Sequence, residues 1–118
     1  MGGEMKTAYL AVPYSHKSPS VRMARFEWAN QAAAHLFKLG YNVLSPISHS
    51  HPISQYMDNS NDSEFWVSVD EYWQRHCDVL FVLKIEGWKD SAGVHREIGL
   101  AIELGQTIKF LEGGDIGI

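Results

Sequence analysis

Glu97 is a carboxylate in a stretch that otherwise has the pattern of a buried helix face. If a helix begins near Ser91, its small and apolar residues recur at three- and four-residue spacing around Glu97, at Val94, Ile98, Ala101, Ile102 and Gly105. An ionised carboxylate is costly to bury unless it gains a partner or its pKa rises. The pattern therefore indicates either a catalytic carboxylate or a first-turn acid that favours the helix dipole and pairs with a core lysine.

Asp70 is the candidate for a second carboxylate at the same site. It lies inside the helix that is expected before an apolar strand, whereas Asp78 directly precedes that strand and is expected to be a structural cap or turn residue. Two carboxylates with a sugar between them can divide the roles of nucleophile and acid in glycosyl chemistry. The alternative is that Asp70 belongs to a solvated helix face.

A second group of candidates follows the first strand, in "PYSHKSPSVRMAR". Arg22 and Arg25 fall in the opening turns of a helix, where the macrodipole is already positive, so an incoming anion would be favoured there. Backbone N–H groups, Ser15 or Ser20 and one arginine could hold a phosphate. His16 lies in the same loop, which begins at Pro13, and both are candidate substrate contacts. In the alternative, both arginines are solvated or pair with carboxylates such as Glu27.

The segment "WKDSAG" just before the Glu97 helix could bind another part of a substrate. Asp90 or Ser91 can cap the helix, and Gly93 would let a ligand approach the backbone closely. Trp88 could stack on a base, although tryptophans are more often core or loop anchors. His49 and His51 have a spacing that puts both side chains on one side of an extended segment, but no third ligand is nearby, so we expect neither a metal nor another cofactor.

Composition narrows the class of protein. The chain has 118 residues, enough for one domain, and a formal net charge of −4. This charge offers no broad basic surface for a nucleic-acid polymer or an anionic membrane. The single Cys77 excludes an internal disulfide, and neither a signal peptide nor a membrane-spanning run is recognisable. We therefore expect a cytoplasmic protein that binds a small molecule.

The order of predicted elements indicates how these residues are brought together. Strands are expected at 7–14, 41–46, 78–85 and 107–112, with helices from Ser18 to Gly40, over 64–75 and from Ser91. A polar loop is expected over 46–62. This alternation predicts a single α/β domain, a three-layer, doubly wound (Rossmann/flavodoxin-like) parallel sheet of four to five strands. Ligands of such sheets bind beyond the carboxyl ends of the strands, where the loops 13–20, 46–62 and 86–93 should meet.

The order of "YLAVPYSH", "GYNVLSP", Asp70, "DVLFVL" and "SAGVHREIGLA" resembles the nucleoside 2-deoxyribosyltransferase-like superfamily. Within it, "YLAVPYSH" and "EGWKDSAGVHREIGLA" are most similar to the family called domain of unknown function 1937 (DUF1937). The resemblance implies one nucleoside 2-deoxyribosyltransferase-like domain over residues 1–118. It also implies that Glu97 attacks the anomeric carbon, that Tyr9 orients the reacting sugar group, and that Asp70 helps to protonate the leaving base.

The superfamily also contains deoxynucleoside 5'-monophosphate N-glycosidases, which carry a serine six residues before the nucleophile, as Ser91 stands before Glu97. The resemblance therefore implies N-glycosidic bond cleavage or exchange on a nucleoside or its 5'-monophosphate, in a homodimer or higher homo-oligomer. Three alternatives remain open. The reaction can be hydrolysis or transfer, and the same fold can bind or sense a nucleotide without turnover. A metal hydrolase built on His49 and His51 would require a metal to copurify.

Overall fold

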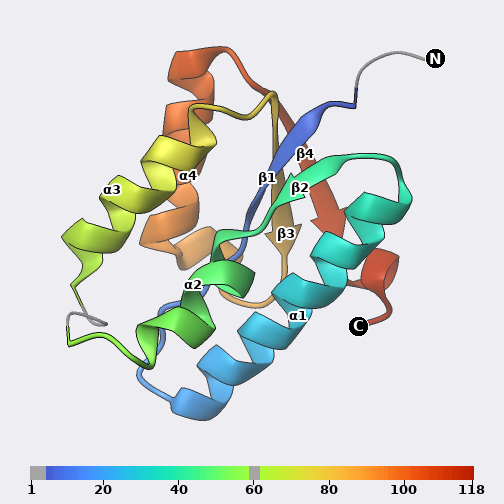
Figure 1. The fold of residues 1–118 in the computed structure, drawn as a ribbon. Coiled ribbons are helices and arrows are strands. Elements are labelled where there is room, and N and C mark those ends of the chain that lie inside the picture. The colour runs from blue at the N-terminus through green and yellow to red at the C-terminus, as the bar shows by residue number, and fades with distance from the viewer. Residues whose placement is uncertain (1–4, 59–61) are drawn as a thin grey trace.

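Four parallel strands form the central layer of the protein, which we describe from a computed structural model covering residues 5–58 and 62–118. The strand order is β2-β1-β3-β4, so the first strand lies inside the sheet (Figure 1). The strands are β1 (Thr7–Ala11), β2 (Asn42–Leu44), β3 (Val79–Lys84) and β4 (Thr107–Glu112). The predicted single α/β domain with a parallel sheet is confirmed.

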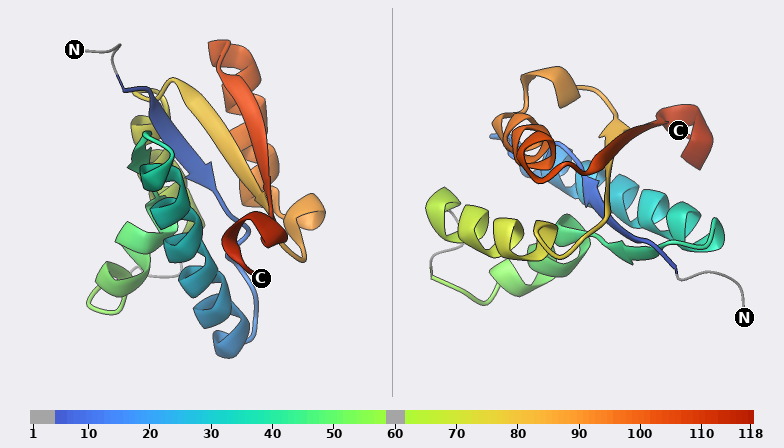
Figure 2. Two further views of the ribbon diagram at one scale, coloured as in Figure 1. Left: turned by 90° about the vertical axis from the view of Figure 1, so that its right-hand side faces the viewer. Right: turned by 90° about the horizontal axis from the view of Figure 1, so that it is seen from above.

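Helices cover both faces of this sheet (Figure 2). The helices are α1 (Pro19–Lys38), α2 (Pro46–Ser54), α3 (Ser63–Gln74) and α4 (Ala92–Leu104), with short 3-10 turns η1 (Trp88–Asp90) and η2 (Gly113–Ile116). The alanine-rich side of α1 packs on one face, and α4 packs on the other with α3 beside it. Residues carried by α3 and α4 therefore share one side of the sheet.

The alternation of side chains along β1 decides which of its residues face α4. Ala8 and Leu10 join the cluster under α1, whereas Tyr9 and Ala11 join the cluster under α4. All four are fully buried, as expected for an internal strand of a parallel sheet. Tyr9 consequently lies on the same side of the sheet as Glu97, although 88 residues separate them in the chain.

The predicted polar loop over 46–62 is wrong in its first half, which forms the helix α2. Ser45 occupies the N-cap position and Pro46 the first turn, where a proline is tolerated because its missing N–H would have no helical partner. Ile47 packs against the core under α1. Serine, histidine and Pro52 are weak helix formers, so the helix depends on this tertiary packing and its local sequence does not predict it.

The Glu97 helix begins as predicted, with Ser91 as the N-cap that accepts a hydrogen bond from the Val94 N–H at 3.2 Å. The predicted apolar stripe is wrong at one position, however. Ile102 is 67% exposed, whereas Leu100, which was not part of the predicted stripe, is buried. The buried side of α4 is therefore displaced around the helix from the side that the spacing suggested.

A buried arginine ties together two of the loops at the carboxyl edge of the sheet. Arg25 donates hydrogen bonds to the carbonyl oxygens of Ser15 at 3.1 Å and Glu86 at 3.2 Å. Gly87, which follows Glu86, has a positive φ of 91°, and a Cβ there would lie 2.5 Å from an Arg25 guanidinium nitrogen. Glycine at this position therefore satisfies both the backbone conformation and the close approach of Arg25.

We expect Gly87→Ala to destabilise the fold by about 1–3 kcal/mol, because it forces a left-handed residue and displaces Arg25. Gly99→Ala is the matched control, since Gly99 lies on the exposed side of α4 and a Cβ added there would meet no atom within 4 Å. This control should stabilise the helix by about 0.5–1 kcal/mol. Urea unfolding of both proteins measures the difference, and equal effects would contradict the role of Gly87.

Candidate active site

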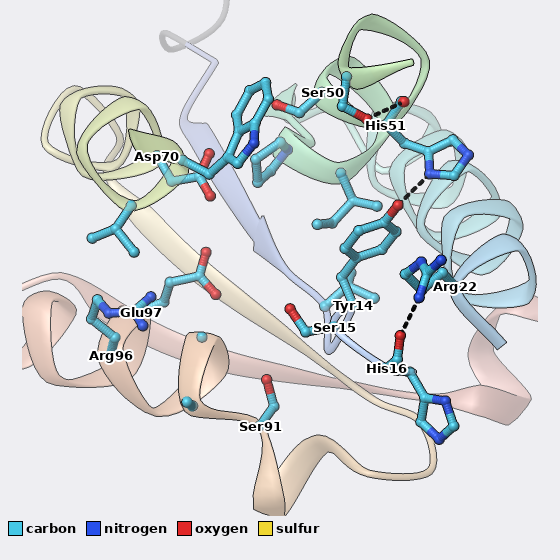
Figure 3. A pocket seen from close by; sticks show the side chains of 18 of the residues that line it. Tyr14, Ser15, His16, Arg22, Ser50, His51, Asp70, Ser91, Arg96 and Glu97 are labelled. Carbon is cyan, nitrogen blue, oxygen red and sulfur yellow. Dashed lines mark hydrogen bonds between the residues drawn. The ribbon is translucent and has the colours of Figure 1, made fainter. Parts of the chain in front are cut away.

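A cavity of about 900 Å³ opens at the carboxyl edge of the sheet. Its walls come from the loop after β1, from α2 and α3, and from the start of α4 (Figure 3). The three predicted loop regions therefore do meet there, although the second contributes mainly helical residues. The candidate residues that line the cavity are Ser15, His16, Arg22, Asp70, Ser91, Gly93 and Glu97.

Tyr9 and Glu97 form the central contact of the site. The Tyr9 hydroxyl donates a hydrogen bond of 2.5 Å to Glu97 Oε2. The pKa of Glu97 is raised to about 8, mainly by burial. The Tyr9 hydrogen bond opposes this rise, the nearby charge of Asp70 adds to it, and Arg96 opposes it. Burial and the Glu97 charge also raise the pKa of Tyr9 well above its usual value, so the phenol stays a donor.

Asp70 points into the same cavity from α3, on the side opposite Glu97 (Figure 3). Burial raises its pKa to about 6, and the Arg96 charge partly offsets this effect. Between about pH 6 and pH 8 the two carboxyl groups therefore hold roughly one proton between them. A pair of this kind can supply one ionised carboxylate and one carboxylic acid at neutral pH.

Gln74 was not singled out from the sequence, yet its side chain reaches from the end of α3 to the main chain of α4. Its side chain is 1% exposed, lines the cavity and donates to the Glu97 carbonyl oxygen at 2.7 Å. Gln106 accepts a second bond from it at 3.3 Å and donates to the carbonyl oxygens of Gln74 and Cys77. The only sequence signal was that Gln74 follows Asp70 by four residues, which places both on one side of α3.

The other end of the cavity is less acidic. Arg22 lines it and donates to the carbonyl oxygen of His16. Among the residues that the structure describes, Arg22 forms no ion pair, so the predicted alternative of a carboxylate partner is not found. Tyr14, also in the wall, shares a hydrogen bond of 2.5 Å with His51 Nδ1, and the His51 ring stacks on Phe26. Tyr14 was not predicted as a site residue.

Four other candidates lie around the cavity, outside its lining. Tyr9 touches the site through Glu97, and Pro13 is fully buried beside it. Arg25 is buried and holds backbone carbonyls, because the turns after β1 and β3 enclose it. Trp88 packs with the α4-side core and lies 5.8 Å from the Phe110 ring, so its present contacts are those of a loop anchor.

His49 and His51 do not converge as the metal hypothesis requires. Residues two apart share a side of an extended segment but not of a helix, and both lie in α2. His51 lines the main cavity, whereas His49 lines a smaller adjoining pocket. Within residues 5–58 and 62–118 no group of three or more potential ligands is placed to hold a metal ion. The same residues contain no helix long and apolar enough to cross a membrane.

Comparison with known proteins agrees with this fold and its motifs. The model of DUF1937, a domain of unknown function, matches residues 6–112. The chain belongs to the DUF1937 family. No curated protein matches it. A solved structure of 2-deoxyribosyltransferase from the psychrotolerant bacterium Bacillus psychrosaccharolyticus superposes with a TM-score of 0.65 at 20% identity, over 90% of this chain and 72% of the other. The DUF1937 chain thus shares its fold with that enzyme.

The buried Glu97 should make the stability of this DUF1937 domain depend on pH. The pKa of Glu97 in the folded protein, about 8, lies above its usual 4.5. The contribution of Glu97 to the free energy of unfolding is therefore fully present below about pH 4.5 and is lost as the pH rises through about 8. Glu97→Gln removes the charge. Its stability advantage over the wild type should therefore grow by about 2–4 kcal/mol between about pH 5 and about pH 9.

Thermal and urea unfolding across this pH range measure the effect. Glu103→Gln is the control, because Glu103 is an exposed glutamate on the same helix. A pH-independent difference for Glu97→Gln, or the same trend in Glu103→Gln, would show that Glu97 is not desolvated in the folded protein.

Proposed function

We propose that this protein cleaves or exchanges the N-glycosidic bond of a nucleoside or nucleoside 5'-monophosphate, with Glu97 as the nucleophile. The observation that carries the proposal is the 2.5 Å hydrogen bond from Tyr9 to Glu97, in a cavity that Glu97 shares with Asp70. The fold of a 2-deoxyribosyltransferase at TM-score 0.65 adds support, since that enzyme is a biocatalyst for the synthesis of nucleosides. Two carboxyl groups that share a proton suit glycosyl chemistry.

The reactive form of the pair has Glu97 ionised and Asp70 protonated, which is the minor singly protonated form because Glu97 has the higher pKa. In this form Glu97 attacks the anomeric carbon while the carbon–nitrogen bond to the base breaks. The electron pair of that bond leaves with the base, and Asp70 supplies the proton. The resulting ester between Glu97 and the sugar is then attacked by water or by a second base, and Asp70 takes up the proton that the attacking group releases. Tyr9 donates to Glu97 before the attack, which favours its ionised form and fixes its orientation.

The other end of the cavity could accommodate an anionic group of the substrate. Arg22 has no carboxylate partner among the described residues, and His16 and Ser15 are exposed beside it. Ser91 and Gly93 line the cavity at the start of α4, where the positive end of the helix dipole favours an anion. These residues support a 5'-monophosphate as one form of the substrate. A pocket that only senses nucleotides is the rival function, favoured by the largely protonated state of Glu97 near neutral pH.

The decisive test is incubation of the protein with deoxynucleosides, ribonucleosides and their 5'-monophosphates, with and without an acceptor base, followed by chromatography. We expect release of free base without acceptor for a hydrolase, or a new nucleoside only with acceptor for a transferase. Glu97→Ala should lower the rate by about a thousandfold or more. Glu103→Gln, on the exposed side of the same helix, should keep full activity.

Full activity in the Glu97→Ala or Glu97→Gln protein would rule out the nucleophile. Tight binding of an intact nucleotide without turnover in the wild type would favour the sensor.

The pH dependence tests the shared proton. We expect a bell-shaped kcat/KM with limbs near about 6 and about 8. Tyr9→Phe removes a donor that favours ionised Glu97, so it should move the alkaline limb to higher pH and lower the maximum by about tenfold or more. Tyr72→Phe removes an exposed hydroxyl and should leave the profile unchanged. A Tyr9→Phe profile identical to that of the wild type would contradict this role.

A further inference from the structure

Gln74 has one polar atom that the protein does not use. Its amide nitrogen is held by the Glu97 carbonyl oxygen at 2.7 Å and by Gln106 Oε1 at 3.3 Å. No described residue donates a hydrogen bond to its amide oxygen Oε1, although the side chain is 99% covered and lines the cavity. Among the described residues the buried side-chain atom without a partner is Ser50 Oγ, so Gln74 Oε1 is not sealed in the core and keeps contact with the open space of the cavity. An amide oxygen that faces a cavity without a protein donor is available to a ligand that donates to it.

The orientation of this amide is determined by its neighbours. A flipped amide would place Oε1 against the Glu97 carbonyl oxygen at 2.7 Å, and two acceptors would repel each other. Gln106 keeps the pair in register, because its own amide nitrogen donates to the Gln74 and Cys77 carbonyl oxygens at 2.8 and 2.9 Å. The oxygen Oε1 is thus the atom of the Gln74 amide that is left to bind a ligand in the cavity.

The position of Gln74 indicates which part of a substrate would donate. The Gln74 amide donates a hydrogen bond to the main chain of Glu97, the residue that is proposed to attack the anomeric carbon. The hydroxyl groups of a sugar lie within a few covalent bonds of that carbon. Asp70, the proposed acid for the leaving base, lies one turn earlier on the same side of α3, about 6 Å along the helix. The helix would therefore present Asp70 to the base and Gln74 to the sugar.

We propose that Gln74 Oε1 is a substrate-binding group that accepts a hydrogen bond from a hydroxyl of the sugar ring. This inference rests on the proposed function and names the part of the substrate that this wall of the cavity recognises. Gln74 thereby has two roles, since its nitrogen positions the main chain of Glu97 while its oxygen selects a hydroxylated sugar. A hydroxyl that bonds there in the transition state would contribute to the rate as well as to binding.

The test is calorimetric binding of four probes to proteins that carry Glu97→Gln, which keeps each probe intact. The probes are adenosine, 2'-deoxyadenosine, 2',3'-dideoxyadenosine and purine 2'-deoxyriboside. The first three lose one sugar hydroxyl at each step, and the fourth lacks only the base amino group of 2'-deoxyadenosine. We expect the loss of one sugar hydroxyl to weaken binding by about five- to tenfold when Gln74 is present. The same loss should have almost no effect in Gln74→Met.

Two further variants separate recognition from structure. Gln106→Met breaks the same amide pair, but Gln106 is not part of the cavity wall, so it should keep the full hydroxyl preference while it loses stability. Gln74→Asn keeps an amide but shortens the side chain by one methylene, so it withdraws the acceptor from the cavity and should lose the preference. Gln74→Asn, compared with Gln106→Met, decides the matter if Gln74→Met does not fold.

Each outcome bears on a different statement. The inference is overturned if the hydroxyl penalty is the same with and without an acceptor at position 74, or if only loss of the base amino group depends on Gln74. In either case the proposed function stands as long as base release depends on Glu97. If no probe binds and no nucleoside or nucleotide is cleaved, both the proposed function and this inference fail.

Discussion

The hydrogen bond between Tyr9 and Glu97 is the constraint on which the rest of the site depends. It joins an internal strand of the sheet to the helix that covers it; Tyr9 is fully buried, and Glu97 is half-buried in the wall of the cavity. A carboxylate here would be strongly unfavourable without a hydrogen-bond donor, and a buried phenol without an acceptor would also destabilise the fold. The pair satisfies both groups at one point and fixes where α4 sits on β1.

The remaining polar groups of the site can be understood as responses to this buried carboxyl. Burial raises the proton affinity of Glu97 and Asp70 together, while Arg96 lowers both. Gln74 and Gln106 then donate hydrogen bonds to the backbone carbonyls of Glu97, Gln74 and Cys77, which ties α3 to α4 and to the start of β4. This arrangement stores an unfavourable charge at the site, and such a charge is common where a fold gives up stability for reactivity.

Several parts of the fold and site were accessible to prediction for identifiable reasons. The strands and α4 have strong periodicity, Ser91 is a clear cap, and the alternation of elements requires the loops to meet at one edge. The helix α2 was missed because its residues are poor helix formers and Ile47 packing compensates for them. Arg25 was expected to meet an anion, but it binds two backbone carbonyls that come together only when the sheet forms.

The sequence by itself determined the parallel α/β architecture and marked Glu97 and Asp70 as candidate carboxylates, because periodicity and burial cost are local properties of the chain. It also carried the resemblance that drew attention to Tyr9 and to the DUF1937 family. Only the tertiary structure decided that Tyr9 bonds Glu97, that Gln74 holds the main chain of Glu97, and that Trp88 lies outside the cavity. These contacts join residues far apart in the chain, and their distances and desolvation exist only once the layers have packed.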